Sequence, residues 1–292
     1  MDNKIFDSKR IALGYTKRPW LHKNVMEQIK KDCCLRENFK NGLDVGCGAG
    51  LSTKALKLIC DKVTGTDISP EMISVCNELY KKEEYEFYVA KAEETIIPRD
   101  KYDIVTAAGV INWVNKERFL ENMNRVTALN GQIVIYDFWI TDKMAGGDTA
   151  YTTWYNDKYL QKFPKPPRQE KIWQQSDLPE NFTMEKQVSY DMTYDFSVKD
   201  FVDFMMIQSN VNAQIESGQK TVEEVKNWMY ETLSPIFNEE GKTLIFSGYN
   251  WYIKKRLDLS MTWCYSFGIT PCHTYRRKLV QCSRYRMRSL KL

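Results

Sequence analysis

Short apolar segments alternate with segments of helical periodicity over the first half of the chain. In residues 21–33 the side chains of Val25, Ile29 and Cys33 recur four positions apart, which predicts a helix with one buried face. Runs rich in β-branched and aromatic residues predict strands at residues 43–45, 62–68, 85–90, 101–108 and 132–139. Because helical patterns separate these strands, we predict an α/β fold with a doubly wound, mostly parallel sheet.

Several predicted helices begin at a typical capping residue. Ser69 is followed by a proline and an acid, the order favoured at a helix N-terminus. Asn115, Ser197 and Thr221 occupy equivalent positions before further helical patterns. We expect residues 1–20, in contrast, to be polar and irregular.

The alternation stops after residue 139. Residues 140–180 combine paired glycines, several prolines and many aromatic side chains, and they are too long for a simple connection. We therefore expect a helical or irregular insertion that covers the active site. Strand character returns at residues 184–196 and again at 242–255, which would be the last strand.

A glycine turn joins the first strand to its helix. Gly46, Gly48 and Gly50 alternate with other residues, and a helical pattern begins at Leu51. Glycine permits the backbone angles of such a turn and lets a ligand approach bare backbone at a helix N-terminus. A dinucleotide fingerprint would need glycine where Leu51 stands. Asp67 ends the second strand, where a doubly wound sheet places an acid that binds ribose hydroxyls.

Residues 43–50 resemble the first motif of the class I S-adenosylmethionine-dependent methyltransferases, and residues 15–256 can be aligned with the pattern of that family. The likeness is greatest to small-molecule enzymes of the trans-aconitate methyltransferase type. It implies a Rossmann-like sheet of seven strands with an antiparallel last strand. It also implies the donor S-adenosylmethionine, the product S-adenosylhomocysteine, and donor contacts from Tyr15, Arg18, Asp44, Gly46, Cys47, Gly48, Gly50, Asp67, Ile68, Met72, Ala92, Glu93 and Ala108.

Two positions depart from the family pattern. Lys91 stands where many relatives have an acid near the adenine, so we expect that contact from Glu93 or from the backbone of Ala92. Asn112 precedes Trp113 where the subgroup commonly has His-Trp beside the transferred methyl group. An amide accepts no proton at neutral pH, so Asn112 is expected to orient the acceptor. The catalytic group is left open, with Asn112, Trp113 and Tyr15 as candidates.

The acceptor is expected to be a small organic molecule, methylated at a carboxylate or hydroxyl oxygen. Methyl transfer from a sulfonium is an in-line displacement that needs a base only when the acceptor must lose a proton. A carboxylate acceptor would be bound by cations such as Arg18 or Lys165. The candidate acceptor contacts are Trp113, Asp137, Tyr151, Trp154 and Arg168.

Composition agrees with one catalytic domain at residues 1–256. The chain has 292 residues, of which 43% are hydrophobic, and no apolar run approaches the roughly 20 residues of a membrane span. We predict a soluble, cytoplasmic monomer or dimer without membrane contact. The eight cysteines do not have the spacing of a disulfide framework, so we expect them to be buried thiols. The two histidines argue against a histidine-rich metal centre or a Ser-His-Asp triad, so no metal is expected.

The net charge of +4 is unevenly distributed. Residues 257–292 contain seven Lys or Arg and one acid, which leaves residues 1–256 slightly acidic. This basic segment has no helical or strand periodicity, so we expect a disordered or non-native extension, and nucleic acid is not an expected partner.

Two other functions are consistent with the same residues. Lys91 and Asn112 would suit a protein that keeps the fold and binds the cofactor without efficient turnover. A nicotinamide-dependent oxidoreductase shares the strand-turn-helix and the acid, although Leu51 disfavours it. Binding of each cofactor and a screen for labelled-methyl transfer would separate the three.

Overall fold

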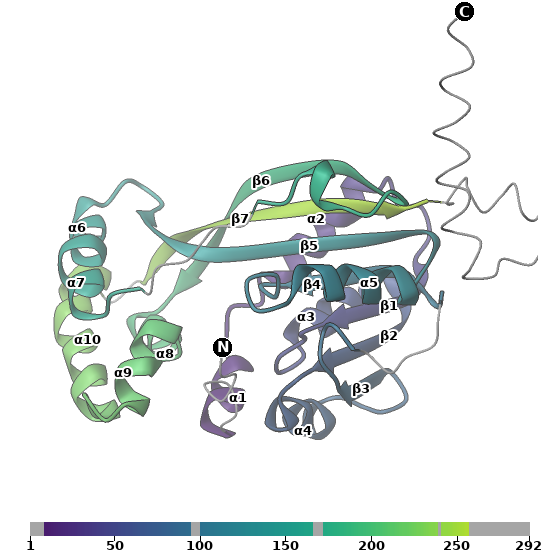
Figure 1. Ribbon diagram of the computed structural model, residues 1–292. Coiled ribbons are helices and arrows are strands. Elements are labelled where there is room, and N and C mark those ends of the chain that lie inside the picture. The colour runs from purple at the N-terminus through teal and green to yellow at the C-terminus, as the bar shows by residue number, and fades with distance from the viewer. Residues whose placement is uncertain (1–8, 95–99, 166–171, 239–240, 257–292) are drawn as a thin grey trace, which may run out of the picture. The chain divides into compact units, whose positions relative to one another are not determined.

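One mixed sheet runs through residues 39–255. Its strands are β1 (Phe39–Val45), β2 (Cys60–Asp67), β3 (Tyr85–Val89), β4 (Tyr102–Ala108), β5 (Thr127–Met144), β6 (Phe182–Phe196) and β7 (Lys242–Lys255). They are arranged in the order β3-β2-β1-β4-β5-β7-β6. The first five strands pair in parallel, whereas β7 is antiparallel to both β5 and β6. The predicted Rossmann-like sheet with an antiparallel last strand is confirmed (Figure 1).

The computed structural model describes residues 9–94, 100–165, 172–238 and 241–256. The chain divides into two units, Met1–Lys255 and Arg256–Leu292, and every helix and strand named here belongs to the first. The basic extension at 257–292 and Arg168 lie outside the described residues. No helix in the described ranges is long and apolar enough to cross a bilayer.

The central strands are buried on both faces. Leu43 and Val45 of β1 and Ile104 and Val105 of β4 have no more than trace exposure, because helices cover the sheet on either side. This is why these strands read as continuous apolar runs and not as an alternating pattern.

The covering helices are α2 (His22–Asp32), α3 (Leu51–Leu56), α4 (Pro70–Leu79) and α5 (Lys116–Val126). The predicted caps are confirmed, since the side chain of Ser69 accepts a hydrogen bond from the Met72 amide and that of Asn115 accepts one from the Arg118 amide. Val25 and Ile29 of α2 are buried, as their spacing predicts, whereas Cys33 lies just after the helix and is half-buried.

The expectation of an irregular N-terminal segment is wrong for α1 (Lys9–Tyr15). Ile11 and Ala12 are buried against Met72 and Val75 of α4. Seven residues give too weak a periodic signal on their own, and tertiary packing stabilises this helix.

The insertion is more regular than we expect from its composition. β5 continues to Met144 and leads into a helical run of α6 (Thr149–Thr153), the π-helical segment η2 (Trp154–Tyr159) and α7 (Leu160–Lys162). A short 3-10 turn, η3 (Gln175–Asp177), precedes β6. The helical run packs with α8 (Val198–Met206), α9 (Ser209–Glu216) and α10 (Val222–Phe237) at the far end of the long strands (Figure 1).

Candidate active site

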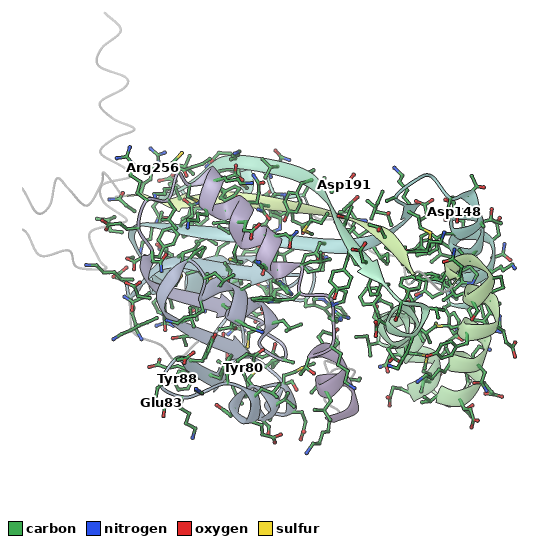
Figure 2. All side chains as sticks on the ribbon, turned by 180° about the vertical axis from the view of Figure 1, so that it is seen from behind. Tyr80, Glu83, Tyr88, Asp148, Asp191 and Arg256 are labelled. Atoms are coloured by element: carbon green, nitrogen blue, oxygen red, sulfur yellow. The ribbon has the colours of Figure 1, made fainter. Side chains whose placement is uncertain are left out.

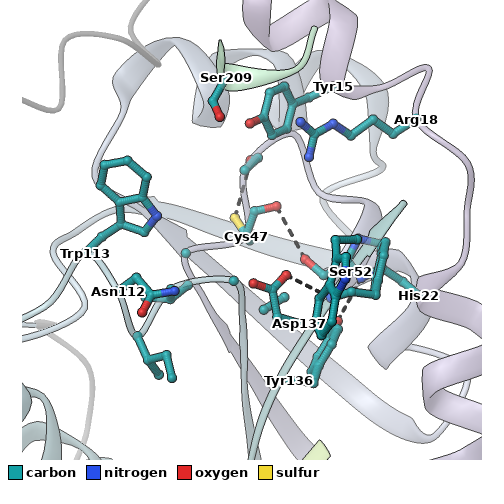
Figure 3. Close-up of a pocket in the computed structure, with 18 of the residues that line it drawn as sticks. Tyr15, Arg18, His22, Cys47, Ser52, Asn112, Trp113, Tyr136, Asp137 and Ser209 are labelled. Carbon is teal, nitrogen blue, oxygen red and sulfur yellow. Dashed lines mark hydrogen bonds between the residues drawn. The ribbon is translucent and has the colours of Figure 1, made fainter. Parts of the chain in front are cut away.

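A cavity of about 1210 Å³ opens at the carboxyl ends of the parallel strands. Its walls include the turns after β1, β2 and β4, the end of β5, the α1–α2 connection and the helices beyond β5 (Figure 3). Such a position is where doubly wound sheets bind ligands. Single-ligand pockets are typically roughly 300–1,000 Å³, so this cavity has room for two ligands side by side.

The glycine turn forms the floor of the cavity. Gly46, Gly48 and Gly50 have φ angles of 69°, 52° and 86°. A Cβ on Gly46 would lie 2.4 Å from Val110, and one on Gly50 would lie 2.6 Å from Tyr80, so packing within the protein excludes side chains at both. A Cβ on Gly48 would meet nothing closer than 3.8 Å. The middle glycine therefore presents bare backbone to the cavity.

We expect Gly48→Ala to fold and to bind a nucleotide-type ligand at least roughly tenfold more weakly, because the added methyl group occupies the space that a ligand needs. The left-handed backbone should lower the free energy of unfolding by about 1 kcal/mol. Gly146→Ala is the matched control, since Gly146 has φ 86° and no atom near its Cβ position. Calorimetry and urea unfolding measure both effects. Equal affinity in the two variants would contradict the contact at Gly48.

Asp67 lies beside this turn at the end of β2. Its Oδ2 accepts a hydrogen bond of 2.8 Å from the Gly48 amide, and its Oδ1 accepts one of 2.9 Å from the Ser69 amide. Both bonds fix the carboxylate at the cavity wall, with Ile68 and Met72 next to it. The fold thus joins the two strongest sequence predictions, the glycine turn and the acid, by a direct hydrogen bond.

Asp44 supports the site from beneath. It is fully buried and accepts hydrogen bonds of 2.6, 2.7 and 2.9 Å from the hydroxyls of Ser52, Thr53 and Thr106. Burial raises the pKa of its carboxyl to about 6, against the opposing effect of these hydroxyls. Neither Asp44 nor Gly50 is part of the cavity wall. Asp44 and Gly50 are therefore corrected from contacts of the donor to residues that position the turn. The Asp44 side chain and the Cβ position of Gly50 both face the protein interior.

Ala92 and Glu93, which follow β3, also line the cavity. Asn122 donates a hydrogen bond of 2.8 Å to the Ala92 carbonyl, and Glu93 Oε1 accepts one of 3.0 Å from the Asn115 amide. The ammonium group of Lys91 is 57% exposed and lies 3.9 Å from Glu94. The anionic and carbonyl acceptors here suit an amino group, as we expect for an adenine-binding edge.

Tyr15 and Arg18 lie over the turn (Figure 3). The Arg18 guanidinium carbon is 3.7 Å from the centre of the Tyr15 ring, a cation–π contact. Its Nη2 donates a long hydrogen bond of 3.5 Å to the Ile207 carbonyl, while its Nε is buried and has no hydrogen-bond partner among the described residues. The N-terminal segment therefore brings an incompletely paired cation to the cavity.

His22 is a cavity residue that sequence reasoning did not select. Its Nδ1 lies 2.8 Å from the Tyr136 hydroxyl, and its ring packs edge-on against Phe138. Burial and the nearby charge of Arg18 lower the pKa of the imidazole to about 3, so the ring is neutral at physiological pH. A lone histidine at the start of a helix has no motif, and only the contact between α2 and β5 brings it to the site.

The turn after β4 and the end of β5 form the remaining wall. Ala108, Asn112, Trp113 and Asp137 all line the cavity, and Trp113 is 40% exposed. Figure 3 shows the Asn112 amide and the Asp137 carboxylate directed into the same space. The Phe138 amide donates a hydrogen bond of 2.8 Å to Asp137 Oδ1.

Tyr151 and Trp154 do not reach the cavity, and their prediction as acceptor contacts is wrong. Both are fully buried in the helical group, where Trp154 stacks on Tyr159 and donates a hydrogen bond of 2.9 Å to Thr232. Their aromatic surface stabilises the insertion itself. Lys165 reaches the cavity and donates a hydrogen bond of 2.7 Å to the Tyr155 hydroxyl.

Comparison with known proteins agrees with this architecture. Residues 43–135 match the profile of a family described as a methyltransferase domain. A protein of Dictyostelium discoideum that carries the name of a methyltransferase is 22% identical over 222 residues, which cover 74% of this chain and 82% of that protein. The malonyl-[acyl-carrier protein] O-methyltransferase 1 of Ilyobacter polytropus is 25% identical over 171 residues, or 55% of this chain and 64% of that enzyme.

Among solved structures, a type II methyltransferase from Anaeromyxobacter dehalogenans aligns with a TM-score of 0.60 at 17% identity, over 80% of this chain and 95% of that one. This likeness shows the shared fold. The family profile spans the glycine turn, Asp67 and the turn after β4, which form one part of the cavity wall. The chain thus carries a methyltransferase domain at residues 43–135 and has the fold of the class I S-adenosylmethionine-dependent methyltransferases.

Proposed function

We propose that this protein transfers a methyl group from S-adenosylmethionine to an oxygen atom of a small organic acceptor, either a carboxylate or a hydroxyl. The observation that carries the proposal is one large cavity. The same cavity is lined by the glycine turn and Asp67 and by Asn112, Trp113 and Asp137. A cavity that holds donor and acceptor together is what an in-line displacement requires.

The residues present fit the methyl donor. Asp67 would bind the ribose hydroxyls, and the bare backbone at Gly48 would allow a close approach. The buried Nε of Arg18, which has no partner among the described residues, would bind the donor's carboxylate. Ala92 and Glu93 would contact the adenine. The donor supplies an electrophilic methyl group on a positively charged sulfur.

The protein's own contribution is alignment and exclusion of water. Tyr15 and Arg18 cover the turn, and the buried aromatic residues Tyr155 and Tyr159 line the same cavity, where they would shield the acceptor from water. Asn112 has the donor and acceptor groups needed to orient an oxygen atom. The O-methyltransferase name of the Ilyobacter polytropus relative supports oxygen as the methylated atom.

The proposal is tested with purified protein and a radiolabelled methyl donor. Calorimetry should detect binding of S-adenosylmethionine and S-adenosylhomocysteine, and NADH should not bind. A panel of carboxylic acids, alcohols, phenols and amines should then yield labelled O-methyl products. Products labelled only at nitrogen would contradict the proposed chemistry. Tight donor binding with no transfer to any class would instead favour a binding protein.

A further inference from the structure

We infer that the acceptor is a planar aromatic molecule methylated at a phenolic hydroxyl, and that Asp137 accepts its proton. The inference rests on the proposed function and names the acceptor class of the same cavity. It is carried by one face of the sheet, where aromatic rings and the Asp137 carboxylate lie together at the cavity wall.

The strand register places these side chains in adjacent rows. Asp137 on β5 is opposite Tyr249 on β7, which is opposite Ser189 on β6. Because side chains alternate between the faces of a sheet, residues two positions away lie on the same face. The neighbouring rows are Ile135, Trp251 and Gln187 on one side, and Trp139, Ser247 and Asp191 on the other.

The aromatic members of these rows form a continuous surface, which we call the aromatic wall (Trp139, Tyr249 and Trp251). The ring centroids of Tyr249 and Trp251 are 4.8 Å apart at 23°, and those of Trp139 and Tyr249 are 6.3 Å apart. All three rings line the cavity, and Trp139 is 47% exposed. Trp251 is buried beneath Tyr249, and the indole and phenol rings at the cavity wall favour a planar ligand that stacks on them.

The charge of these rows disfavours an acidic acceptor. They contain no lysine or arginine, and the carboxylate of Asp137 lines the cavity, whereas that of Asp191 lies outside it. Three cations line other parts of the cavity: Arg18 lies over Tyr15, where it would bind the donor, Lys91 lies near Glu94, and Lys165 donates to Tyr155. A carboxylate placed on the aromatic wall would face like charge, whereas a neutral phenol would not.

Asp137 is located where a proton acceptor is needed. A Cβ on Gly109, the first residue after β4, would lie 3.3 Å from Asp137 Oδ1. The carboxylate therefore lies against the same turn that carries Asn112 and Trp113. In the transfer, the phenolic O–H bond breaks toward the Asp137 carboxylate and an O–C bond forms to the methyl group. The C–S bond breaks with its electron pair on sulfur, which becomes a neutral thioether.

A probe with both kinds of oxygen separates the acceptor classes directly. We expect 4-hydroxybenzoate to yield an ether, which resists mild alkali, and not a methyl ester, which alkali cleaves. Phenols should be turned over at least roughly tenfold more efficiently than cyclohexanols of the same size, because a saturated ring loses the stacking. Mass spectrometry before and after alkali identifies the product.

Variants test the two roles separately. Trp139→Leu should weaken phenol binding roughly threefold to tenfold, measured by calorimetry in the presence of S-adenosylhomocysteine, and leave the affinity for S-adenosylhomocysteine unchanged. Tyr88→Leu is the matched control, because Tyr88 is 50% exposed on β3 and does not line the cavity (Figure 2). Asp137→Asn should lower kcat for phenol by roughly 100-fold or more. The loss should be much smaller for a nitrophenol, which is already ionised near neutral pH.

The outcomes distinguish this inference from the proposed function. Ester products, or efficient turnover of aliphatic acids with none of phenols, would overturn the aromatic acceptor while leaving O-methylation intact. Equal losses of kcat for phenol and nitrophenol in Asp137→Asn would overturn the proton acceptor. If no acceptor is methylated, phenol binding that depends on Trp139 still supports the subsite, and its absence refutes it. Failure to bind the donor would refute the proposed function itself.

Discussion

Asp67→Ala is expected to weaken the binding of S-adenosylmethionine at least roughly 100-fold. Each hydrogen bond from a ribose hydroxyl to a carboxylate is worth about 1.5–3 kcal/mol, and the substitution removes two acceptor atoms. The Gly48 and Ser69 amides also lose their partner, which loosens the turn on which the donor would rest. Calorimetric titration with S-adenosylmethionine and S-adenosylhomocysteine measures the effect.

Two companion variants keep this result interpretable. Asp67→Asn retains one oxygen acceptor for the neighbouring amides and should show an intermediate loss, with near-normal stability to urea. Glu83→Ala removes a carboxylate from the exposed turn before β3, outside the cavity, and should bind the donor normally (Figure 2). Donor affinity within threefold of wild type in Asp67→Ala would show that another group holds the ribose.

The second large effect is a pH dependence of stability that His22→Asn should reveal. Because the pKa of His22 is lowered to about 3 in the folded protein, the unfolded chain binds more protons below its usual value of 6.5. His22 therefore contributes stability above pH 6.5 that is lost as the pH falls. Between pH 6.5 and 4.5 this loss amounts to about 2 kcal/mol.

Asp44 acts in the opposite direction over much of the same range. Its folded pKa of about 6 lies above the unfolded value of 3.8, so protonation favours the folded protein. Its contribution is full below pH 3.8 and is lost as the pH rises through 6. The two groups nearly cancel in the wild-type protein between pH 4.5 and 6, and we expect a shallow stability curve there.

Urea unfolding at a series of pH values separates the two contributions. His22→Asn should gain stability relative to wild type as the pH is lowered from 6.5 to 4.5, and Asp44→Asn should lose it. Tyr136→Phe removes the hydroxyl that contacts Nδ1 but leaves the imidazole buried, so the wild-type profile should persist. Parallel curves for wild type and His22→Asn would mean that the imidazole titrates normally in the folded state.

Local chemistry made the cofactor half of the site predictable. Positive φ angles at Gly46, Gly48 and Gly50 are a property of a few consecutive residues, and so is the cap at Ser69. The order of strand, turn and helix then places Asp67 beside the turn, because parallel strands end at one edge of the sheet. The role of Asp44 was harder to predict, because the motif does not indicate which of its residues face the protein interior.

The acceptor half depends on contacts between distant segments. The aromatic residues at 151 and 154 and those at 139 and 249 look alike in sequence, yet the first pair is buried in the helical group and the second pair lines the cavity. Strand register brings the second pair to the cavity, because it aligns Asp137, Tyr249 and Ser189 across three strands. His22 reached the cavity through the packing of α2 on β5, a contact with no local signal.

The sequence by itself determined the fold class, the glycine turn and the acid at the end of β2. These follow from backbone angles, capping and the period of apolar residues, which act over a few positions. Only the tertiary structure decided which aromatic rings line the cavity, which acid supports the turn from beneath and which titratable groups enter the cavity. Side-chain direction and burial depend on which segments pack together, and that information is spread along the whole chain.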